Sequence, residues 1–287
     1  VGRGLAVAAE QTRCPLVATN HFMPENLFAH ARIPAALQAV AARWAWRDLA
    51  RVYRRADVVT APTPRAVELL ASAAGVMGAL PVSCGIDATR FTPGQRVESD
   101  EPVVLFVGRL DPEKRVDELL RAFAILPPGT PGRMEIVGDG SRRVVWQELA
   151  EQLGIAHRVT FRGVISDDEL VAAYARADVF CMPGIAELQS LATLEAMAAA
   201  TPVVAANAMA LPHLVQPGRN GWLYHPGKIS ELAAALGTLL SDPALRRRMG
   251  AAGRDIALQH DLDATLERFE QIYTGVVEHV PARPYAA

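Results

Sequence analysis

Short apolar runs alternate with longer amphipathic stretches along most of the 287 residues, and this alternation restricts the fold more than any other feature. Val103-Val-Leu-Phe-Val107 and Asp178-Val-Phe-Cys-Met182 are typical of buried parallel strands. Strands that alternate with helices predict an α/β fold of doubly wound parallel sheets with right-handed crossovers. Because such sheets bind ligands beyond the carboxyl ends of their strands, candidate site residues are expected there.

The length suits about two domains. A polar stretch with Pro, Gly and acidic residues, Phe91 to Pro102, predicts an interdomain linker. We therefore expect a partial N-terminal domain at 1–97, a second domain at 98–262, and a final helix with a loose tail at 263–287. The first domain shows neither the opening strand nor the Gly-rich turn of a doubly wound sheet, so the chain is expected to begin inside that domain.

The individual elements follow from the same patterns. Strands are expected at 16–19, 57–60, 81–83, 103–107, 134–137, 159–161, 178–182 and 202–206, and helices at about 35–55, 64–73, 114–126, 142–153, 167–177, 190–199, 229–240, 243–258 and 262–277.

Composition excludes several classes of protein. With 51% hydrophobic and 21% charged residues, the chain is not of a disordered, collagen-like or coiled-coil type. No apolar run approaches the roughly 18 residues that cross a bilayer, and the first residues do not form a signal peptide. Cys14, Cys84 and Cys181 are scattered and form no CxxC pair, which argues against a disulfide framework or a zinc site. We expect a cytoplasmic protein without a metal.

One candidate anion site directly follows the strand at 103–107. Gly108 permits a close turn, and Arg109 and Lys114 flank the start of a helix whose free amides also favour anions. Two cations at a positive helix end suit a phosphate or a pyrophosphate. The alternative is a set of surface ion pairs with the neighbouring acids, Asp111, Glu113 or Asp117.

A second cluster pairs two carboxylates, Glu187 and Glu195, with seven residues between them. Ser190 is expected to cap the helix between them, and the free amides near Ser190, Leu191 and Ala192 suit a phosphate. Since phosphates repel carboxylates, the two Glu side chains more plausibly accept hydrogen bonds from hydroxyls, as a sugar and a ribose offer. The alternative is an ordinary acidic helix start.

The first half of the chain holds two further candidates. His21 follows the strand at 16–19, where it suits substrate binding or proton transfer, although a lone His is more often structural. The helix at 35–55 carries an arginine stripe interleaved with aromatic residues, which suits an anionic membrane surface or is simply a solvated face. The stripe comprises Arg43, Arg47, Arg51 and Arg54 or Arg55, with Trp44, Trp46 and Tyr53. With no recognition motif and a net charge of -2, we expect no nucleic-acid partner.

Together these motifs resemble the retaining GT-B glycosyltransferases of glycosyltransferase family four. The resemblance spans about residues 14 to 275, with the family's order and gaps. It rests on Gly85-Ile86-Asp87, Gly108-Arg109 with Lys114, Gly138-Asp139-Gly140, Val159 to Gly163, Glu187-x7-Glu195 with Ala196-Met197-Ala198, and Thr201-Pro-Val-Val204. It implies two Rossmann-like domains facing across a cleft, the first incomplete here because the family's opening Gly-rich loop is absent.

The resemblance also implies a role for each residue. Arg109 and Lys114 would bind the donor's pyrophosphate and stabilise the leaving group, without a metal or a cofactor. Glu187 would contact the donor sugar, Glu195 the ribose and His21 the sugar from the acceptor side, while residues from Arg162 to Val164 would read the base. Gly108, Gly138, Ser190, Leu191 and Ala192 would complete the donor site in the 98–262 domain, and the last helix would return to the first domain.

The implied activity is transfer of a hexose, with retention, from a nucleotide-diphosphate sugar of the GDP-mannose or UDP-glucose type. The stretch from Glu187 to Glu195 looks most like bacterial members with lipid or inositol-lipid acceptors, and the Arg43–Arg55 stripe would suit a peripheral place at the inner face of the membrane. Leu188-Gln189-Ser190 replaces the family's common Gly-Phe-Gly, and Cys84 replaces its common Asn. The alternative is a truncated, catalytically silent paralogue that only binds nucleotide sugar or a protein partner.

Overall fold

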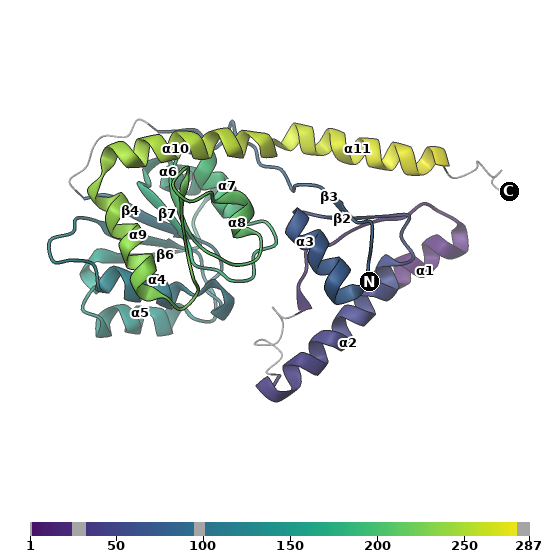
Figure 1. Cartoon of the computed structure of the whole chain (residues 1–287), viewed down its shortest axis with the longest axis horizontal. Coiled ribbons are helices and arrows are strands. Elements are labelled where there is room, and N and C mark those ends of the chain that lie inside the picture. The colour runs from purple at the N-terminus through teal and green to yellow at the C-terminus, as the bar shows by residue number, and fades with distance from the viewer. Residues whose placement is uncertain (1, 25–32, 95–100, 280–287) are drawn as a thin grey trace. The chain divides into compact units, whose positions relative to one another are not determined.

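A computed structural model describes residues 2–24, 33–94 and 101–279, which form two compact units (Figure 1). The first unit comprises Val1–Gly85 and Leu262–Ala287, and the second comprises Ile86–Asp261. The boundary therefore precedes the expected one at 97–98, because Ile86 and Phe91 are buried in the core of the second unit. Residues 95–100 of the expected linker, and the loose tail expected from Pro281, lie outside the described residues.

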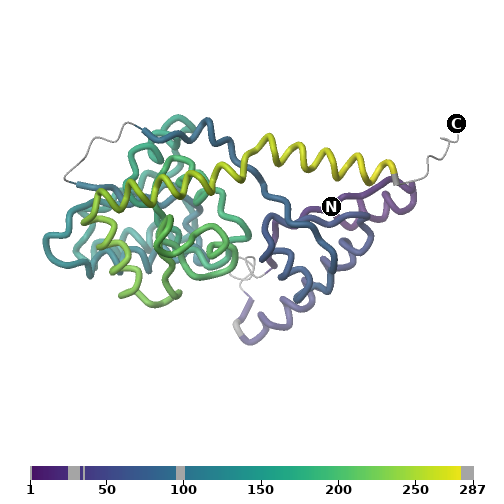
Figure 2. The backbone as a smooth tube through the Cα atoms, turned by 45° about the horizontal axis from the view of Figure 1, so that its top comes forward, coloured from purple at the N-terminus to yellow at the C-terminus, as the bar shows by residue number. Residues whose placement is uncertain are grey.

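The first unit is built on three short parallel strands in the order β1-β2-β3. Their bounds are β1 Val17–Thr19, β2 Val58–Ala61 and β3 Leu80–Pro81. The helices are α1 Gly2–Thr12, which the sequence analysis did not predict, α2 Ala35–Tyr53, α3 Pro64–Leu69 with a π-helical turn Leu70–Ala74, and α11 Leu262–His279. Helix α11, the yellow helix of Figure 2, contributes Ile272 and Val276 to a cluster with Val82, which ties the last helix to the first unit.

The second unit has six parallel strands in the order β6-β5-β4-β7-β8-β9, so the expected α/β fold with parallel sheets is confirmed. The strands are β4 Val103–Val107, β5 Arg133–Val137, β6 Val159–Gly163, β7 Val179–Met182, β8 Val203–Ala206 and β9 Gly221–Tyr224. The helices are α4 Val116–Ala124, α5 Arg143–Gln152, α6 Asp167–Arg176, α7 Leu191–Ala198, α8 Leu211–Leu214, α9 Ile229–Ser241 and α10 Pro243–Ala257. Strand β9 and helix α8 were not predicted.

The strand order places a topological switch point between β4 and β7. From β4 the chain moves outward to β5 and β6, and it then returns to the other side of β4 to form β7, β8 and β9. Since all these strands are parallel, the segments that follow β4 and β7 begin side by side at one edge of the sheet. That edge is the usual ligand position in doubly wound sheets.

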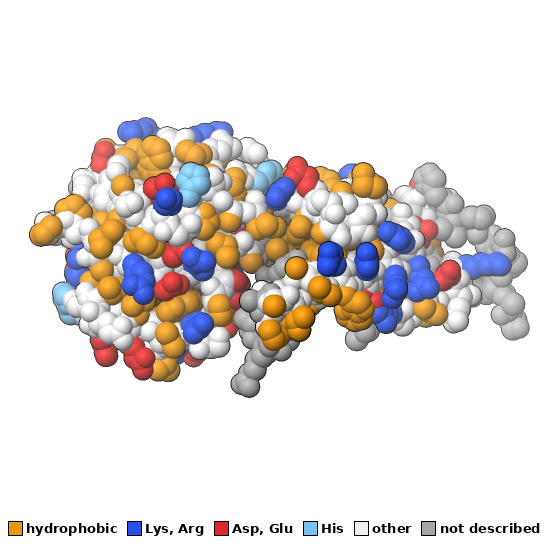
Figure 3. Space-filling view, turned by 60° about the horizontal axis from the view of Figure 1, so that its bottom comes forward, with side chains coloured by type: hydrophobic (Ala, Val, Ile, Leu, Met, Phe, Trp, Pro, Cys, Tyr) orange, Lys and Arg blue, Asp and Glu red, His pale blue; other side chains and the backbone are white. Residues whose placement is uncertain are grey.

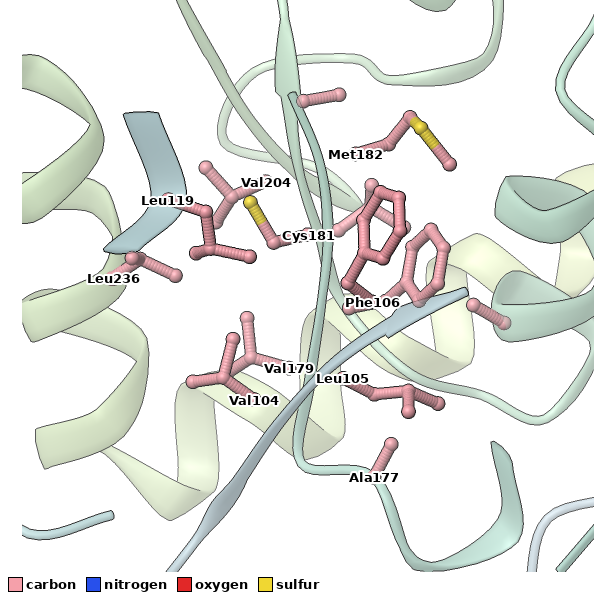
Figure 4. Packing of buried hydrophobic residues seen from close by; sticks show 14 of the residues in the cluster. Val104, Leu105, Phe106, Leu119, Ala177, Val179, Cys181, Met182, Val204 and Leu236 are labelled. Atoms are coloured by element: carbon pink, nitrogen blue, oxygen red, sulfur yellow. The ribbon is translucent and has the colours of Figure 1, made fainter. Parts of the chain in front are cut away.

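Apolar side chains from the central strands and the flanking helices hold this edge in place. Figure 4 shows Cys181 of β7 close to Leu119 of α4, in a packed cluster that also contains Phe106 of β4 and Leu236 of α9. All four side chains are fully buried, as expected for parallel strands that are covered on both faces. A core packed this closely fixes where β4 and β7 end, and so fixes the segments that follow them.

Candidate functional site

The segments after β4 and β5 turn close to one another beside the switch point. Gly138 has a φ of +123°, and a Cβ at that position would lie 2.0 Å from the carbonyl oxygen of Gly108. The Gly108 amide donates to the carbonyl oxygen of Val137 at 3.0 Å. Only glycine at 138 permits this approach, so two of the expected donor-site glycines form one compact turn region.

Lys114 and Glu187 meet across the switch point, although 73 positions separate them. The distance from Lys114 Nζ to Glu187 Oε1 is 2.5 Å, and the two side chains are 16% and 11% exposed. The Ile185 amide also donates to the carbonyl oxygen of Glu113 at 3.0 Å, which joins the two loops through the backbone. The structure thus brings together a cation and a carboxylate that the sequence placed in separate clusters.

Arg109 extends from the same loop as Lys114 and forms ion pairs with acids of that loop. Its Nη1 lies 2.6 Å from Asp111 Oδ2, and its Nη2 lies 2.8 Å from Glu113 Oε1. Asp111 is held in turn by the Ser141 hydroxyl, which donates to its Oδ1 at 2.9 Å. The ion pairs named above as the alternative are therefore present. The Arg109 side chain is still 60% exposed, so its guanidinium keeps donors that an anion can reach.

Helix α7 begins at the second cluster, but Ser190 does not cap it as expected. Ser190 adopts the left-handed conformation, with φ 71° and ψ 78°, and its Oγ lies 2.8 Å from the Thr193 hydroxyl instead of accepting from a backbone amide. The prediction of a side-chain cap is therefore wrong, because a capping serine has an extended backbone that brings its Oγ to the amides of the first turn, and Ser190 does not. The first amides of the helix, at Leu191 and Ala192, have no intrahelical carbonyl to bond and form a positive end that favours anions.

Glu195 lies further along α7, and a tyrosine that belongs to none of the sequence motifs holds its carboxylate. The hydroxyl of Tyr174, on α6, donates to Glu195 Oε2 at 2.7 Å. Burial raises the pKa of Glu195, while the Tyr174 hydrogen bond and the charge of Arg90 lower it. No local sequence signal marks a core tyrosine of one helix as the partner of a carboxylate on the next.

Val164 follows β6, two strands away from β4 in the sheet order. Its side chain is 82% exposed. The preceding carbonyl, of Gly163, accepts from the Gly138 amide at 2.8 Å, so this segment borders the turn formed by Gly108 and Gly138. The expected base-reading segment therefore adjoins the turns at Gly108 and Gly138 through its backbone.

His21 belongs to the first unit, unlike the other expected site residues. It follows β1, and its Nδ1 lies 3.7 Å from Cys84 Sγ. Partial burial lowers the pKa of His21, and burial raises the pKa of the Cys84 thiol. The imidazole thus favours its neutral form beside a protonated thiol.

The arginine stripe lies on an exposed face of α2. Arg43, Arg47 and Arg51 are exposed, and Trp44 is 66% exposed beside them. The apolar Leu37 and Val40 are exposed in the same helix, and Trp46 and Tyr53 are buried, so only one of the three aromatic residues accompanies the stripe. Figure 3 shows basic and hydrophobic side chains gathered on the surface of this part of the molecule.

Arg54 and Arg55, the last positions of the expected stripe, follow the end of α2. Arg54 is the C-cap of α2, and Arg55 pairs with Glu10 of α1 at 3.2 Å.

Within the described ranges, no helix is long and apolar enough to cross a membrane. The same part of the chain holds no group of three His, Cys, Asp or Glu side chains placed to bind a metal ion.

Matches to two protein families together cover almost all of the chain. Residues 88–256 match the family described as "Glycosyl transferases group 1", and residues 1–90 match "Glycosyltransferase Family 4". The first match lies entirely within the second unit and includes every residue expected at the donor site except His21.

Relatives and solved structures agree with these matches. The chain is 31% identical to sulfoquinovosyl transferase SQD2 of Arabidopsis thaliana, over 83% of this chain and 49% of that protein. It is 35% identical to a GDP-mannose-dependent alpha-(1-6)-phosphatidylinositol monomannoside mannosyltransferase of Mycolicibacterium smegmatis, over 74% of this chain and 60% of that protein. The structure of sucrose-phosphate synthase from Thermosynechococcus elongatus superposes with a TM-score of 0.82 at 26% identity, covering 95% of this chain and 71% of that one. The chain therefore spans 49% and 60% of the lengths of these two relatives.

Proposed function

This chain belongs to the glycosyl transferases of group 1, and from that membership we propose that it moves a hexose from a nucleotide-diphosphate sugar to an acceptor. The observation that carries the proposal is the contact between Lys114 and Glu187 at the switch point, with Arg109 on the same loop. Cations that bind a diphosphate and a carboxylate that binds hydroxyls are the groups that a sugar nucleotide requires.

The proposed chemistry follows from the charges at this edge of the sheet. The leaving diphosphate gains negative charge as the sugar departs, and Arg109 and Lys114 stabilise that charge. The amides of Leu191 and Ala192, at the start of α7, bind phosphate oxygens. When Lys114 turns to a phosphate, Glu187 loses its partner and becomes an acceptor for a sugar hydroxyl. We propose that these groups suffice without a divalent metal or a cofactor.

Glu195 and Val164 complete the proposed donor site, with Glu195 at the ribose and the segment around Val164 at the base. GDP-mannose and UDP-glucose are the donor types we propose, and the printed name of the mycobacterial relative, a GDP-mannose-dependent enzyme, supports the first. Retention at the anomeric carbon and a role of His21 beside the donor sugar rest on the family resemblance. They are part of the same proposal.

We further propose a lipid or inositol-lipid acceptor, reached from a peripheral position on the cytoplasmic face of a membrane. The mycobacterial relative is named for a phosphatidylinositol-based acceptor. On α2, the exposed Arg43, Arg47 and Arg51 suit anionic headgroups, and the exposed Trp44 suits the interface between headgroups and acyl chains.

Calorimetry with UDP-glucose, GDP-mannose, UDP and GDP tests the donor site. The sequence holds two lysines, which provide a matched pair of variants: Lys114→Met removes the site cation, and Lys228→Met removes the N-cap residue of α9. We expect Lys114→Met to weaken binding at least about tenfold, since it removes a charge-assisted contact, and Lys228→Met to leave binding unchanged. Equal effects of the two variants, or no binding by the unaltered chain, would refute the proposal. Donor binding without transfer would support the silent paralogue.

Flotation with vesicles tests the membrane proposal. The double variant Arg47→Glu with Arg51→Glu reverses two charges of the stripe, and Arg247→Glu with Arg248→Glu reverses two exposed charges of α10. Each basic residue near an anionic surface contributes about 1 kcal/mol, so the first pair should lower binding to phosphatidylglycerol-containing vesicles at least about tenfold. If the two pairs behave alike, or if pure phosphatidylcholine binds equally well, the stripe is only a solvated helix face.

A further inference from the structure

Tyr174 and Glu195 form a partly buried contact between α6 and α7. Tyr174 is fully buried, and its hydroxyl lies 2.7 Å from Glu195 Oε2. A buried phenol needs a partner for its O–H group, and a carboxylate is a strong acceptor. The contact is therefore strong enough to restrict the orientation of the Glu195 carboxylate.

Aromatic neighbours fix the position of the Tyr174 ring. Phe91 meets it edge-on, with ring centroids 5.4 Å apart and an interplanar angle of 87°, and the centroid of Phe180 lies 6.0 Å away. Rings packed at these distances in a closed core have little freedom to move.

The backbone that carries Tyr174 is fixed as well. Helix α6 begins with a capping box, in which Ser166 and Glu169 each accept a hydrogen bond from the other's backbone amide. The cap residue Ser166 lies two positions after Val164, and Val164 belongs to the segment proposed to meet the base. Tyr174 is thus anchored by its ring, its hydroxyl and its helix.

We propose that Tyr174 is a positioning residue for Glu195: it holds Oε2 of the carboxylate and leaves Oε1 to accept hydrogen bonds from the ribose hydroxyls of the donor. This inference rests on the proposed function, because it assumes that Glu195 meets the ribose. It adds that ribose recognition depends on a hydroxyl from a second helix, which itself touches no substrate.

The charge state of Glu195 follows from the same contacts. Burial raises the pKa of Glu195, whereas the Tyr174 hydrogen bond and the charge of Arg90 lower it. The carboxylate is the form that accepts from hydroxyls, so donor affinity is complete above this pKa and is lost as the pH falls through it. Removing the Tyr174 hydroxyl raises the pKa further, and the loss of affinity then begins at a higher pH.

The test compares Tyr174→Phe with the unaltered chain in calorimetry, with UDP and GDP and with their 2′,3′-dideoxy counterparts. We expect the variant to bind the ribonucleotide about tenfold more weakly, as for the loss of a hydrogen bond to a charged group. Both proteins should bind the dideoxy nucleotide equally well. The acid limb of ribonucleotide binding, which is the pH range in which affinity falls as the solution is acidified, should move to higher pH in the variant. A purely structural role of Tyr174 would weaken the binding of both nucleotides and leave the acid limb in place.

Tyr224→Phe is the matched control. Tyr224 is also fully buried in the second unit, and its hydroxyl donates to a carboxylate, Glu118 Oε2, at 2.8 Å. Its removal should cost a similar amount of thermal stability while nucleotide affinity and the acid limb stay unchanged.

Glu195→Ala separates the two levels of the inference. If Glu195→Ala removes the preference for ribose over dideoxyribose and Tyr174→Phe does not reduce it, the positioning role is refuted and the ribose assignment stands. If Glu195→Ala keeps the full preference, the ribose assignment fails and the positioning role fails with it. Absence of binding to UDP and GDP by the unaltered chain would overturn the proposed function itself.

Discussion

Replacing Gly184 with alanine tests whether the geometry of the Lys114–Glu187 contact, and not only its charges, is needed for donor recognition. A Cβ at position 184 would lie 2.8 Å from Glu187 Oε1, 3.3 Å from Met182 Sδ and 3.5 Å from Lys114 Cδ. The substitution changes no charge and removes no hydrogen-bonding group. The φ of Gly184 is also not positive, so the backbone at this position does not strain an alanine.

The expected size of the effect follows from that distance. Oε1 must retreat by about 0.6 Å to reach an ordinary contact of 3.4 Å, and this moves the end of the Glu187 side chain that makes the 2.5 Å contact with Lys114 Nζ. Since a misplacement of about 1 Å in a catalytic site costs on the order of 100-fold, we expect roughly a tenfold loss of turnover. Affinity for a sugar nucleotide should fall more than affinity for the free nucleoside diphosphate, because Glu187 is assigned to the sugar.

The assay is calorimetric binding of sugar nucleotides and free diphosphates, followed by turnover and thermal unfolding. Gly237→Ala, in helix α9, is the control: its Cβ would make only an ordinary contact at 3.5 Å with Leu126, so stability should rise slightly and donor binding should not change. If Gly184→Ala binds sugar nucleotides and turns over as the unaltered chain does, the placement of Glu187 at the donor sugar is refuted.

Three further outcomes are expected. Arg109→Ala should lower both donor affinity and turnover, the latter on the order of 100-fold, because the guanidinium meets charge that grows on the leaving group; undiminished turnover would exclude that role. Excess EDTA should leave the turnover of the unaltered protein unchanged, and a loss restored by Mg²⁺ or Mn²⁺ would contradict the proposed metal independence. Gly138→Ala should lower the free energy of unfolding by more than about 3 kcal/mol, since its Cβ would lie 2.0 Å from a backbone oxygen. The control Gly154→Ala, at φ +72° with open space around it, should lower the free energy of unfolding by only about 1 kcal/mol. Equal urea midpoints of the two variants would refute the steric argument.

The sequence predicted most strands of the second unit because their apolar runs reflect burial on both faces. Strand β9, Gly221–Tyr224, escaped prediction because only part of it is buried. Its extended form comes from pairing with β8, which no local pattern reveals. The unit boundary was misplaced for a related reason. The polar stretch that begins at Phe91 is typical of a linker, yet the Phe91 ring packs on Tyr174.

The candidate site was predictable in its residue types and only partly in its arrangement. Parallel strands end at one edge, so the sequence placed Lys114 and Glu187 at that edge, where they meet at 2.5 Å. Their proximity depends on the order in which the strands lie, and β4 and β7 are neighbours only because the chain returns past β5 and β6. The left-handed conformation of Ser190 and the Tyr174–Glu195 contact depend on tertiary packing, and for this reason periodicity did not indicate them.

The ion pairs of the site determine how strongly its cations attract a ligand, and a count of charged residues does not show this. Arg109 already contacts Asp111 and Glu113, and Lys114 already contacts Glu187, so an arriving diphosphate exchanges partners with carboxylates and does not meet bare cations. The net Coulomb gain is then smaller than two free cations would give, and more of the selectivity must come from the positions of the groups. Affinity for inorganic pyrophosphate should accordingly be weak, and tight binding should need the ribose and the sugar, whose hydroxyls we propose as the ligands of the two glutamates.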